Sequence, residues 1–184
     1  MTTSSLTRFS TTLTDVTLKD WRECQLGNFQ SPQSGRIAGP MTAPDQPAHA
    51  MVRLLARVIG VGIESADMLV REVLLRGFRD RRAVARYAGL TGAPDESGAK
   101  RREKGLAKSG NSRVRRGLIQ LAWRFLLFQR NSALARWYVE RTSGTKGARK
   151  TTMIVALARK LLIALWRLAT TGLVPDGVVL RSAV

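Results

Sequence analysis

The sequence contains one cysteine and one histidine among 184 residues, and this scarcity excludes several kinds of site. Cys24 alone cannot form an internal disulfide, which indicates a reducing, cytoplasmic location. Cys24 and His49 cannot supply a zinc finger, and they do not make a cysteine–histidine nucleophile pair. We therefore expect no metal site and no cofactor in this chain.

Long apolar runs are also missing. The longest apolar stretches, MIVALA and LLIALW, are separated by Arg159 and Lys160, which argues against a membrane-spanning helix. No apolar segment follows a basic start at the N-terminus, so we expect no secretory signal. No membrane partner is expected.

Acidic residues are few: 13 Asp and Glu stand against 31 Lys and Arg, which gives a net charge of +18. Such a charge favours salt-sensitive binding to polyanions, nucleic acid first and an anionic membrane surface second. Residues 1–47 are rich in Ser, Thr, Pro and Gly, and their basic and acidic residues balance. We predict a disordered leader over 1–47, a basic domain over 48–178 and a tail over 179–184.

The basic domain has apolar residues at helical spacing and no convincing alternation typical of strands. The sequence therefore predicts an all-α, multi-helix fold, with Asp80 capping a short helix and a loop from Gly89 to about Asn111. The helices are expected at residues 51–59, 64–75, 80–89, 112–142 (one helix or two) and 151–172. The aromatic residues of the fourth segment are better explained by core packing than by stacking on bases: Trp123, Phe125, Phe128, Trp137 and Tyr138.

The stretch VIGVGIESADML, residues 58–69, is typical of a helix-hairpin-helix, here expected at about 51–76. Gly60 and Gly62 would allow a tight turn that directs the amide groups of the second helix toward a phosphate. Such a motif grips the DNA backbone without reading sequence. The alternative is an ordinary turn in which the glycines only permit close packing.

The loop APDESGAKRREKGLAKSGNSRVRRG, residues 93–117, combines one serine near its start with a dense run of basic residues. Ser97 could attack a phosphate that cations and helix amides hold. The alternative is a solvated basic face and an ordinary loop serine. The candidate nucleic-acid ligands here are Lys100, Arg101, Arg102, Lys108, Gly110, Asn111, Arg113, Arg115 and Arg116.

Three stretches in order carry a family resemblance: IGVGIESADMLVREV, RAVARYAGLTGAPDESGAKRREKGLAKSGNSRVRRGLIQLAW and VALARKLLIALW. Together, over residues 48–178, they resemble the C-terminal half of DEDD-type insertion-sequence transposases. These are serine-using recombinases of bacterial mobile elements that are guided by a bridge RNA. The resemblance implies a bacterial cytoplasmic protein that acts on DNA, with a guide RNA, full-length transposase or a second copy of the chain as further partners.

In that family, an N-terminal RuvC-like domain supplies acidic residues that bind Mg²⁺, and the C-terminal domain supplies a serine that joins a DNA end. By resemblance, Ser97 is that nucleophile, and Arg101, Arg102, Lys108 and Asn111 belong to the phosphate-binding segment. The expected reaction is strand exchange through a phosphoserine intermediate.

Two departures from the family pattern qualify this expectation. Gly105 lies one place later than the pattern expects relative to Ser97, and nothing before residue 48 resembles a RuvC-like domain. We therefore expect a truncated transposase that binds DNA and is inactive alone. The alternatives are a non-catalytic helix-hairpin-helix module that binds DNA or RNA backbone, and a membrane-surface protein that uses its last amphipathic helix.

Overall fold

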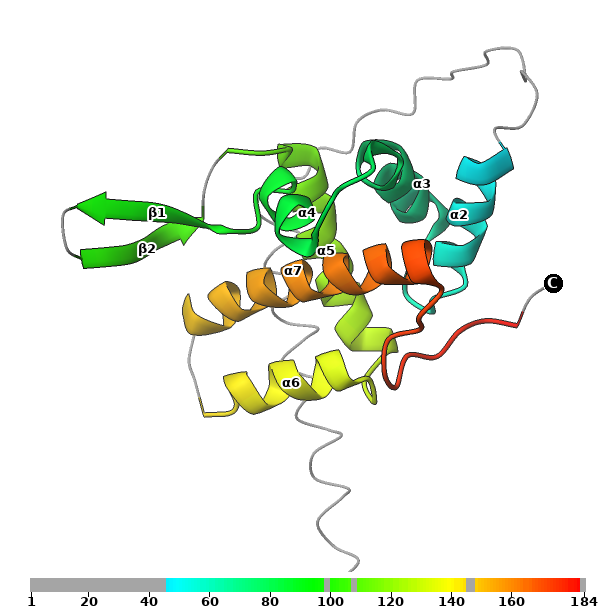
Figure 1. The fold of residues 1–184 in the computed structure, drawn as a ribbon. Helices are drawn as coiled ribbons and strands as arrows, with labels where there is room; N and C mark the ends of the chain where they lie inside the picture. The colour runs from blue at the N-terminus through cyan, green and yellow to red at the C-terminus, as the bar shows by residue number, and fades with distance from the viewer. Residues whose placement is uncertain (1–45, 98–99, 107–108, 145–147, 183–184) are drawn as a thin grey trace, which may run out of the picture. The chain divides into compact units, whose positions relative to one another are not determined.

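Helices make up most of the residues that this computed structural model of the protein describes, which are 46–97, 100–106, 109–144 and 148–182. The chain divides into residues 1–46 and residues 47–184, and all of the described residues except Gln46 belong to the second unit. The predicted leader falls outside the described residues except for its last two, which begin the first helix (Figure 1).

The helical fold is confirmed, with the addition of one β-hairpin. The elements are α2 (Gln46–Ala56), α3 (Ile63–Glu72), the 3₁₀ turn η1 (Leu74–Arg76), α4 (Arg81–Tyr87), β1 (Gly92–Ser97), β2 (Lys100–Leu106), α5 (Ser112–Phe128), α6 (Ala133–Thr142) and α7 (Ala148–Thr171). The predicted loop from Gly89 to Asn111 was wrong in this respect, because most of it pairs as antiparallel strands. The register sets Asp95 opposite Arg102 and Glu96 opposite Arg101, a matching by charge that favours pairing without apolar alternation.

Capping side chains define where the shorter helices begin. The predicted cap Asp80 is confirmed: its carboxylate accepts a hydrogen bond of 2.7 Å from the Ala83 amide. That bond holds the pKa of the Asp80 carboxyl below its usual value, partly opposed by desolvation. Ser132 caps α6 in the same way, accepting from Ala135 at 3.2 Å. The predicted fourth helical segment therefore consists of two helices, α5 and α6.

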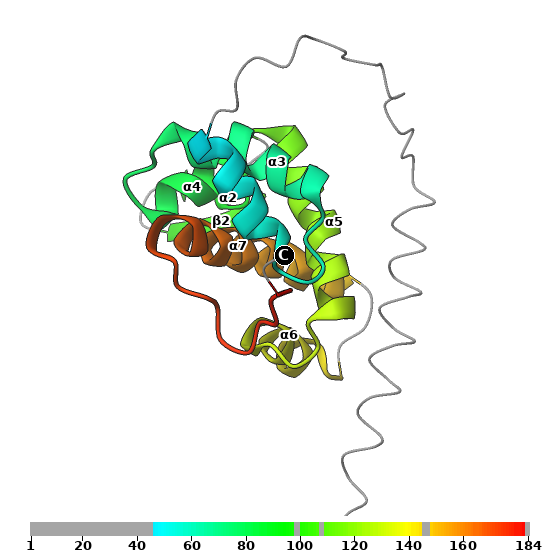
Figure 2. The same ribbon diagram turned by 90° about the vertical axis from the view of Figure 1, so that its right-hand side faces the viewer.

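The core forms where α7 lies across α5 and α6 (Figures 1 and 2). Leu118, Leu121 and Phe125 of α5 are buried, as are the Leu and Ile side chains along the inner face of α7. Trp123 and Tyr138 are also buried, as the core interpretation predicts, but Phe128 is 57% exposed and that part of the prediction was wrong. Phe128 is the last residue of α5.

The C-terminal segment returns to the turn between α2 and α3. Val58 and Leu180 form an antiparallel bridge, and the Arg181 amide donates to the Arg57 carbonyl at 2.7 Å. The buried side chain of Gln129 joins the two segments: its Nε2 donates to the carbonyls of Ile59 (2.8 Å) and Val179 (2.9 Å). Its Oε1 accepts from the Val179 amide at 2.9 Å. Residues 179–181, part of the predicted tail, thus hold the α2–α3 turn.

None of the helices in the described part of the chain is both long and apolar enough to cross a membrane.

Candidate nucleic-acid interface

The turn between α2 and α3 contains both glycines of the predicted helix-hairpin-helix. Gly60 is buried at φ +98°, and a Cβ there would lie 3.3 Å from the Cβ of Phe128. Close packing therefore explains Gly60. Gly62 precedes the first turn of α3, whose first residue, Ile63, is 70% exposed. The two helices and the turn are present, and phosphate binding by them stays a prediction.

Arg124 is a candidate that the sequence did not reveal. Its Nη2 lies 3.7 Å from the position that a Cβ on Gly62 would take, so a cation stands beside the start of α3. Arg124 lies on α5, more than fifty residues further along the chain, on the exposed side of that helix. The helical pattern shows only that Arg124 is off the apolar stripe, and the packing of α3 on α5 decides what it faces.

The start of α5 is joined to the end of α4 by a glycine and an asparagine. Gly110 has φ +107°, and a Cβ there would lie 2.7 Å from both the Gly89 nitrogen and the Tyr87 carbonyl oxygen. The Asn111 amide donates to that same Tyr87 oxygen at 2.8 Å. No side chain fits at position 110, so the glycine is required by this close approach of two backbones.

The Asn111 side chain is fully engaged within the protein. Its Oδ1 accepts from the amides of Arg113 (3.0 Å) and Val114 (3.2 Å), which caps α5. Its Nδ2 donates to Glu72 Oε2 at 2.9 Å and to the Tyr87 hydroxyl at 3.3 Å. We call Gly110 and Asn111 the α4–α5 joint. Phosphate binding by Asn111 is untested, and its observed contacts connect the ends of α3 and α4 to α5.

Cations surround this joint on the first turn of α5. Arg113 is 75% exposed and its Nη1 lies 3.5 Å from Glu72 Oε1. Arg116 is exposed, and its Nε donates to the Ser112 carbonyl at 3.4 Å. Arg115 differs, because its Nη1 is buried and has no hydrogen-bond partner among the described residues. A guanidinium nitrogen in that state is unfavourable unless an anion supplies an acceptor.

Ser97 is the last residue of β1 and pairs in register with Lys100. The hairpin therefore brings Ser97, Lys100 and Arg101 together at one end, while its other end, Gly92 and Leu106, adjoins the α4–α5 joint. Only the backbone is described for residues 93–97 and 100–105, and Lys108 lies outside the described residues. Figure 1 shows that the hairpin and the α2–α3 turn lie on opposite sides of the helices, so the two predicted motifs do not form one site.

A divalent metal is implied by the family resemblance, but the described residues do not fit one. They contain no group of three or more His, Cys, Asp or Glu side chains placed to hold a metal ion.

Comparison with known proteins shows what this region is similar to. Residues 52–140 match the model of the Transposase IS116/IS110/IS902 family. Over these residues the chain is similar to this transposase family. Over 139 residues it is also 44% identical to a protein named "Putative transposase y4rJ" from Sinorhizobium fredii (strain NBRC 101917 / NGR234). That alignment covers 75% of this chain and 34% of the relative, so the chain spans about a third of the relative's length.

The residues that match the family model run from within α2 to within α6. They include the α2–α3 turn, the hairpin with Ser97 and the α4–α5 joint, so every predicted site residue falls among them. Helix α7, which supplies much of the core, lies beyond the matched residues. Both candidate surfaces thus belong to the part of the chain that matches the family model.

Proposed function

We propose that this transposase domain binds DNA through its backbone phosphates and supplies Ser97 as the nucleophile of strand exchange. The observation that carries the proposal is the register of the hairpin, which sets Ser97 directly opposite Lys100 and next to the position of Arg101. A nucleophile for phosphoryl transfer needs cations at the phosphate that it attacks, because negative charge develops there in the transition state.

The proposed chemistry has two balanced steps. In the first, Ser97 Oγ forms a bond to phosphorus while the bond from phosphorus to a sugar oxygen breaks. A base takes the serine proton, and the leaving sugar oxygen receives a proton. In the second, the hydroxyl of another strand attacks the phosphoserine, and the serine oxygen leaves with a proton. The phosphodiester is conserved as a protein ester, so no nucleotide energy is consumed.

The α4–α5 joint has a positioning role in this proposal. Through the contacts of Gly110 and Asn111 with Tyr87 and Gly89, it ties the segment that follows the hairpin to the segment that precedes it. The nearby Nη1 of Arg115, buried without a partner in the described structure, is the first candidate to donate a hydrogen bond to a phosphate oxygen. Exposed Arg113 and Arg116 extend the cationic surface along the first turn of α5.

The resemblance assigns the Mg²⁺-binding carboxylates to a separate RuvC-like domain, and we propose that attack by Ser97 requires that domain. It also suggests that a guide RNA selects the DNA. The test is therefore incubation of the chain with labelled element-end DNA, Mg²⁺ and an isolated RuvC-like domain, followed by denaturing electrophoresis. We expect a covalent protein–DNA adduct that Ser97→Ala abolishes and that the matched control Ser112→Ala retains.

An adduct that survives Ser97→Ala refutes the assignment of the nucleophile, and the absence of any adduct refutes the catalytic proposal. The second candidate is then a module that only holds DNA or RNA backbone, favoured by the net charge of +18 and by the exposed arginines of α5. It predicts that the logarithm of the binding constant falls with the logarithm of salt concentration, with a slope of about −0.9 per phosphate contacted. Replacing Arg113 and Arg116 by Ala should reduce that slope by about 2.

A further inference from the structure

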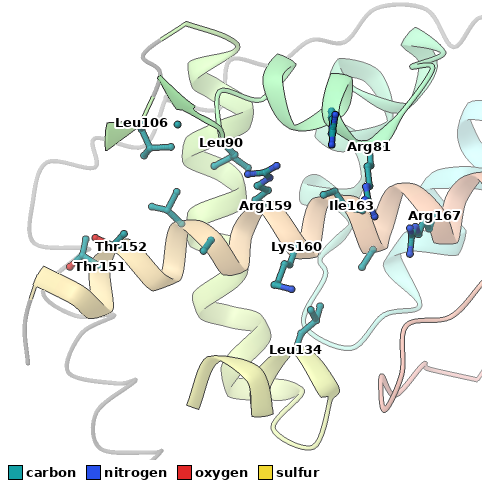
Figure 3. A pocket seen from close by; sticks show the side chains of 15 residues that line it. Arg81, Leu90, Leu106, Leu134, Thr151, Thr152, Arg159, Lys160, Ile163 and Arg167 are labelled. Atoms are coloured by element: carbon teal, nitrogen blue, oxygen red, sulfur yellow. The ribbon is translucent and has the colours of Figure 1, made fainter. Parts of the chain in front are cut away.

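A groove runs along α7 on the surface between α4 and α6 (Figure 3). Its volume is about 1040 Å³. Figure 3 shows Arg81 and Arg159 on the α4 side of α7, and Lys160 and Leu134 on the α6 side. The start and end of the hairpin, Gly92 and Leu106, close one end of the groove. We call this surface the α7 groove.

The charged residues that line the α7 groove are all cations. They are Arg81, Arg82, Arg159, Lys160 and Arg167. Lys160 has a partner, since its Nζ lies 4.6 Å from the centre of the Trp137 ring. The four arginines form no ion pair with any described residue, and no acidic residue lines the groove. The groove therefore offers positive charge that the described part of the protein does not neutralise.

Apart from Thr151, Thr152 and Gly92, the remaining lining is aliphatic, and none of it is aromatic. Leu90, Leu134, Val155 and Ile163 contribute to it, and the small side chains of α7 alanines lie between the larger ones. Apart from the buried Leu90, these side chains are partly exposed, and Leu106 at the end of the groove is 38% exposed. Apolar surface of this kind is stabilised by an apolar partner that removes it from water.

These two features distinguish between possible occupants. A nucleic-acid strand would pair with the arginines, but single-stranded bases bind mainly by stacking on aromatic rings, and the groove has none in its lining. A phosphodiester backbone alone would leave the aliphatic lining in contact with water. An amphipathic helix with acidic residues beside an apolar stripe satisfies both the arginines and the aliphatic side chains.

We propose that the α7 groove binds such an acidic amphipathic helix of a partner protein. Its length is suitable, because the lining residues of α7 extend from Thr151 to Arg167, about 24 Å at 1.5 Å per residue. That distance accommodates roughly four turns of a bound helix. The inference does not rest on the proposed strand-exchange activity, and the α7 part of the groove lies outside the residues that match the transposase family.

The probe is a synthetic, fluorescein-labelled helical peptide of sixteen residues, with leucines at i, i+3, i+4 and i+7 spacing and glutamates on both sides of that stripe. Its binding to the full chain is measured by fluorescence anisotropy at physiological salt. We expect saturable binding that Ile163→Asp weakens at least tenfold. The double variant Arg159→Glu/Arg167→Glu should weaken it by a similar factor, and should bind a peptide with lysines in place of glutamates better than the wild type does.

The matched control separates the groove from the general attraction of a basic protein for an acidic peptide. The double variant Arg53→Glu/Arg130→Glu changes the net charge by the same amount, at exposed arginines that do not line the groove. It should bind the acidic peptide within about twofold of the wild type. Circular dichroism melts test whether each variant is folded. If Ile163→Asp does not fold, Ile163→Ala takes its place, and it should weaken binding less than Ile163→Asp would.

Three results would overturn the proposal. One is the absence of saturable peptide binding, and another is equal weakening by the groove variant and its charge-matched control. The third is that Arg159→Glu/Arg167→Glu weakens the binding of a sixteen-nucleotide DNA strand more than the control variant does, but does not weaken the binding of the peptide more than the control does. That outcome would assign the groove to nucleic acid.

Discussion

Replacement of Asn111 by alanine tests the α4–α5 joint most directly. The substitution removes the cap of α5, which is worth about 1 kcal/mol. It also removes the Nδ2 donor from Glu72, a contact of 2.9 Å to a carboxylate whose side chain is only 26% exposed. Because Arg113 stays 3.5 Å from that carboxylate, the second loss is about 1 to 2 kcal/mol rather than more. The expected destabilisation is about 2 to 3 kcal/mol.

The assay is urea unfolding of the chain, followed by circular dichroism at pH 7. In a thermal melt the same change corresponds to roughly 6 to 12 °C, since 1 kcal/mol shifts a domain of this size by about 3 to 4 °C. The matched control is Asn131→Ala, at an exposed asparagine in the turn between α5 and α6. Like other surface substitutions, it should change the free energy of unfolding by less than about 0.5 kcal/mol.

A second variant, Asn111→Asp, separates the cap from the contact with Glu72. Aspartate caps a helix as well as asparagine does, but its carboxylate would face the Glu72 carboxylate in place of an amide donor. The repulsion raises the pKa of one of the two carboxyls in the folded state, so the variant should recover stability relative to the wild type as pH falls. If Asn111→Asp is as stable as the wild type at pH 7, or if Asn111→Ala costs less than about 0.5 kcal/mol, the reasoning is refuted.

Three further predictions concern other parts of the fold. Gly110→Ala should lower the free energy of unfolding in urea by at least about 3 kcal/mol, because its Cβ would meet two backbone atoms at 2.7 Å. Gly77→Ala, in open space at φ +60°, should lower it by about 1 kcal/mol. Equal losses would contradict the steric argument. Gln129→Ala should lower the free energy of unfolding by about 3 kcal/mol or more, since the three hydrogen bonds of this buried side chain are lost. Hydrogen exchange at the Val179 amide should then be faster than in the wild type, and an unchanged rate would contradict the prediction. Because the pKa of Asp80 is lowered in the folded state, its carboxylate stabilises the folded protein at a pH above 3.8, the pKa in the unfolded chain. This stabilisation is lost as the pH falls through the lower pKa of the folded state. The advantage of the wild type over Asp80→Asn should therefore be present at pH 6 and fade in acid, and a constant difference would refute it.

The sequence predicts the helices well because their signals are local. Apolar spacing locates α5 and α7, and an aspartate before a short amphipathic run locates the start of α4. The hairpin carries no such signal, since β1 and β2 are mainly charged or small residues without alternating apolar positions. Its register sets two acidic residues opposite two arginines, a pattern that a search for apolar periodicity does not detect.

The candidate site shows the same division. Asn111 stands directly before a helix, which is a capping signal, but the surrounding basic residues favour its interpretation as a phosphate ligand. Its contacts with Glu72 and Tyr87 span 39 and 24 residues of sequence, and nothing local indicates them. Gln129 is a stronger case, because its buried amide is explained only by carbonyls 70 and 50 residues away. The arginines of the α7 groove were visible as charge, but their common surface depends on how α4 packs on α7.

The bridge between the two ends of the domain has a consequence during protein synthesis. The contact between Arg57 and Arg181 joins residues 124 positions apart, and the α2–α3 turn receives its last hydrogen bonds only from that distant segment. A ribosome that adds about 5 to 20 residues per second needs roughly 6 to 25 s to make the intervening chain. For that interval each newly made molecule carries a complete glycine turn without the later segment that holds it.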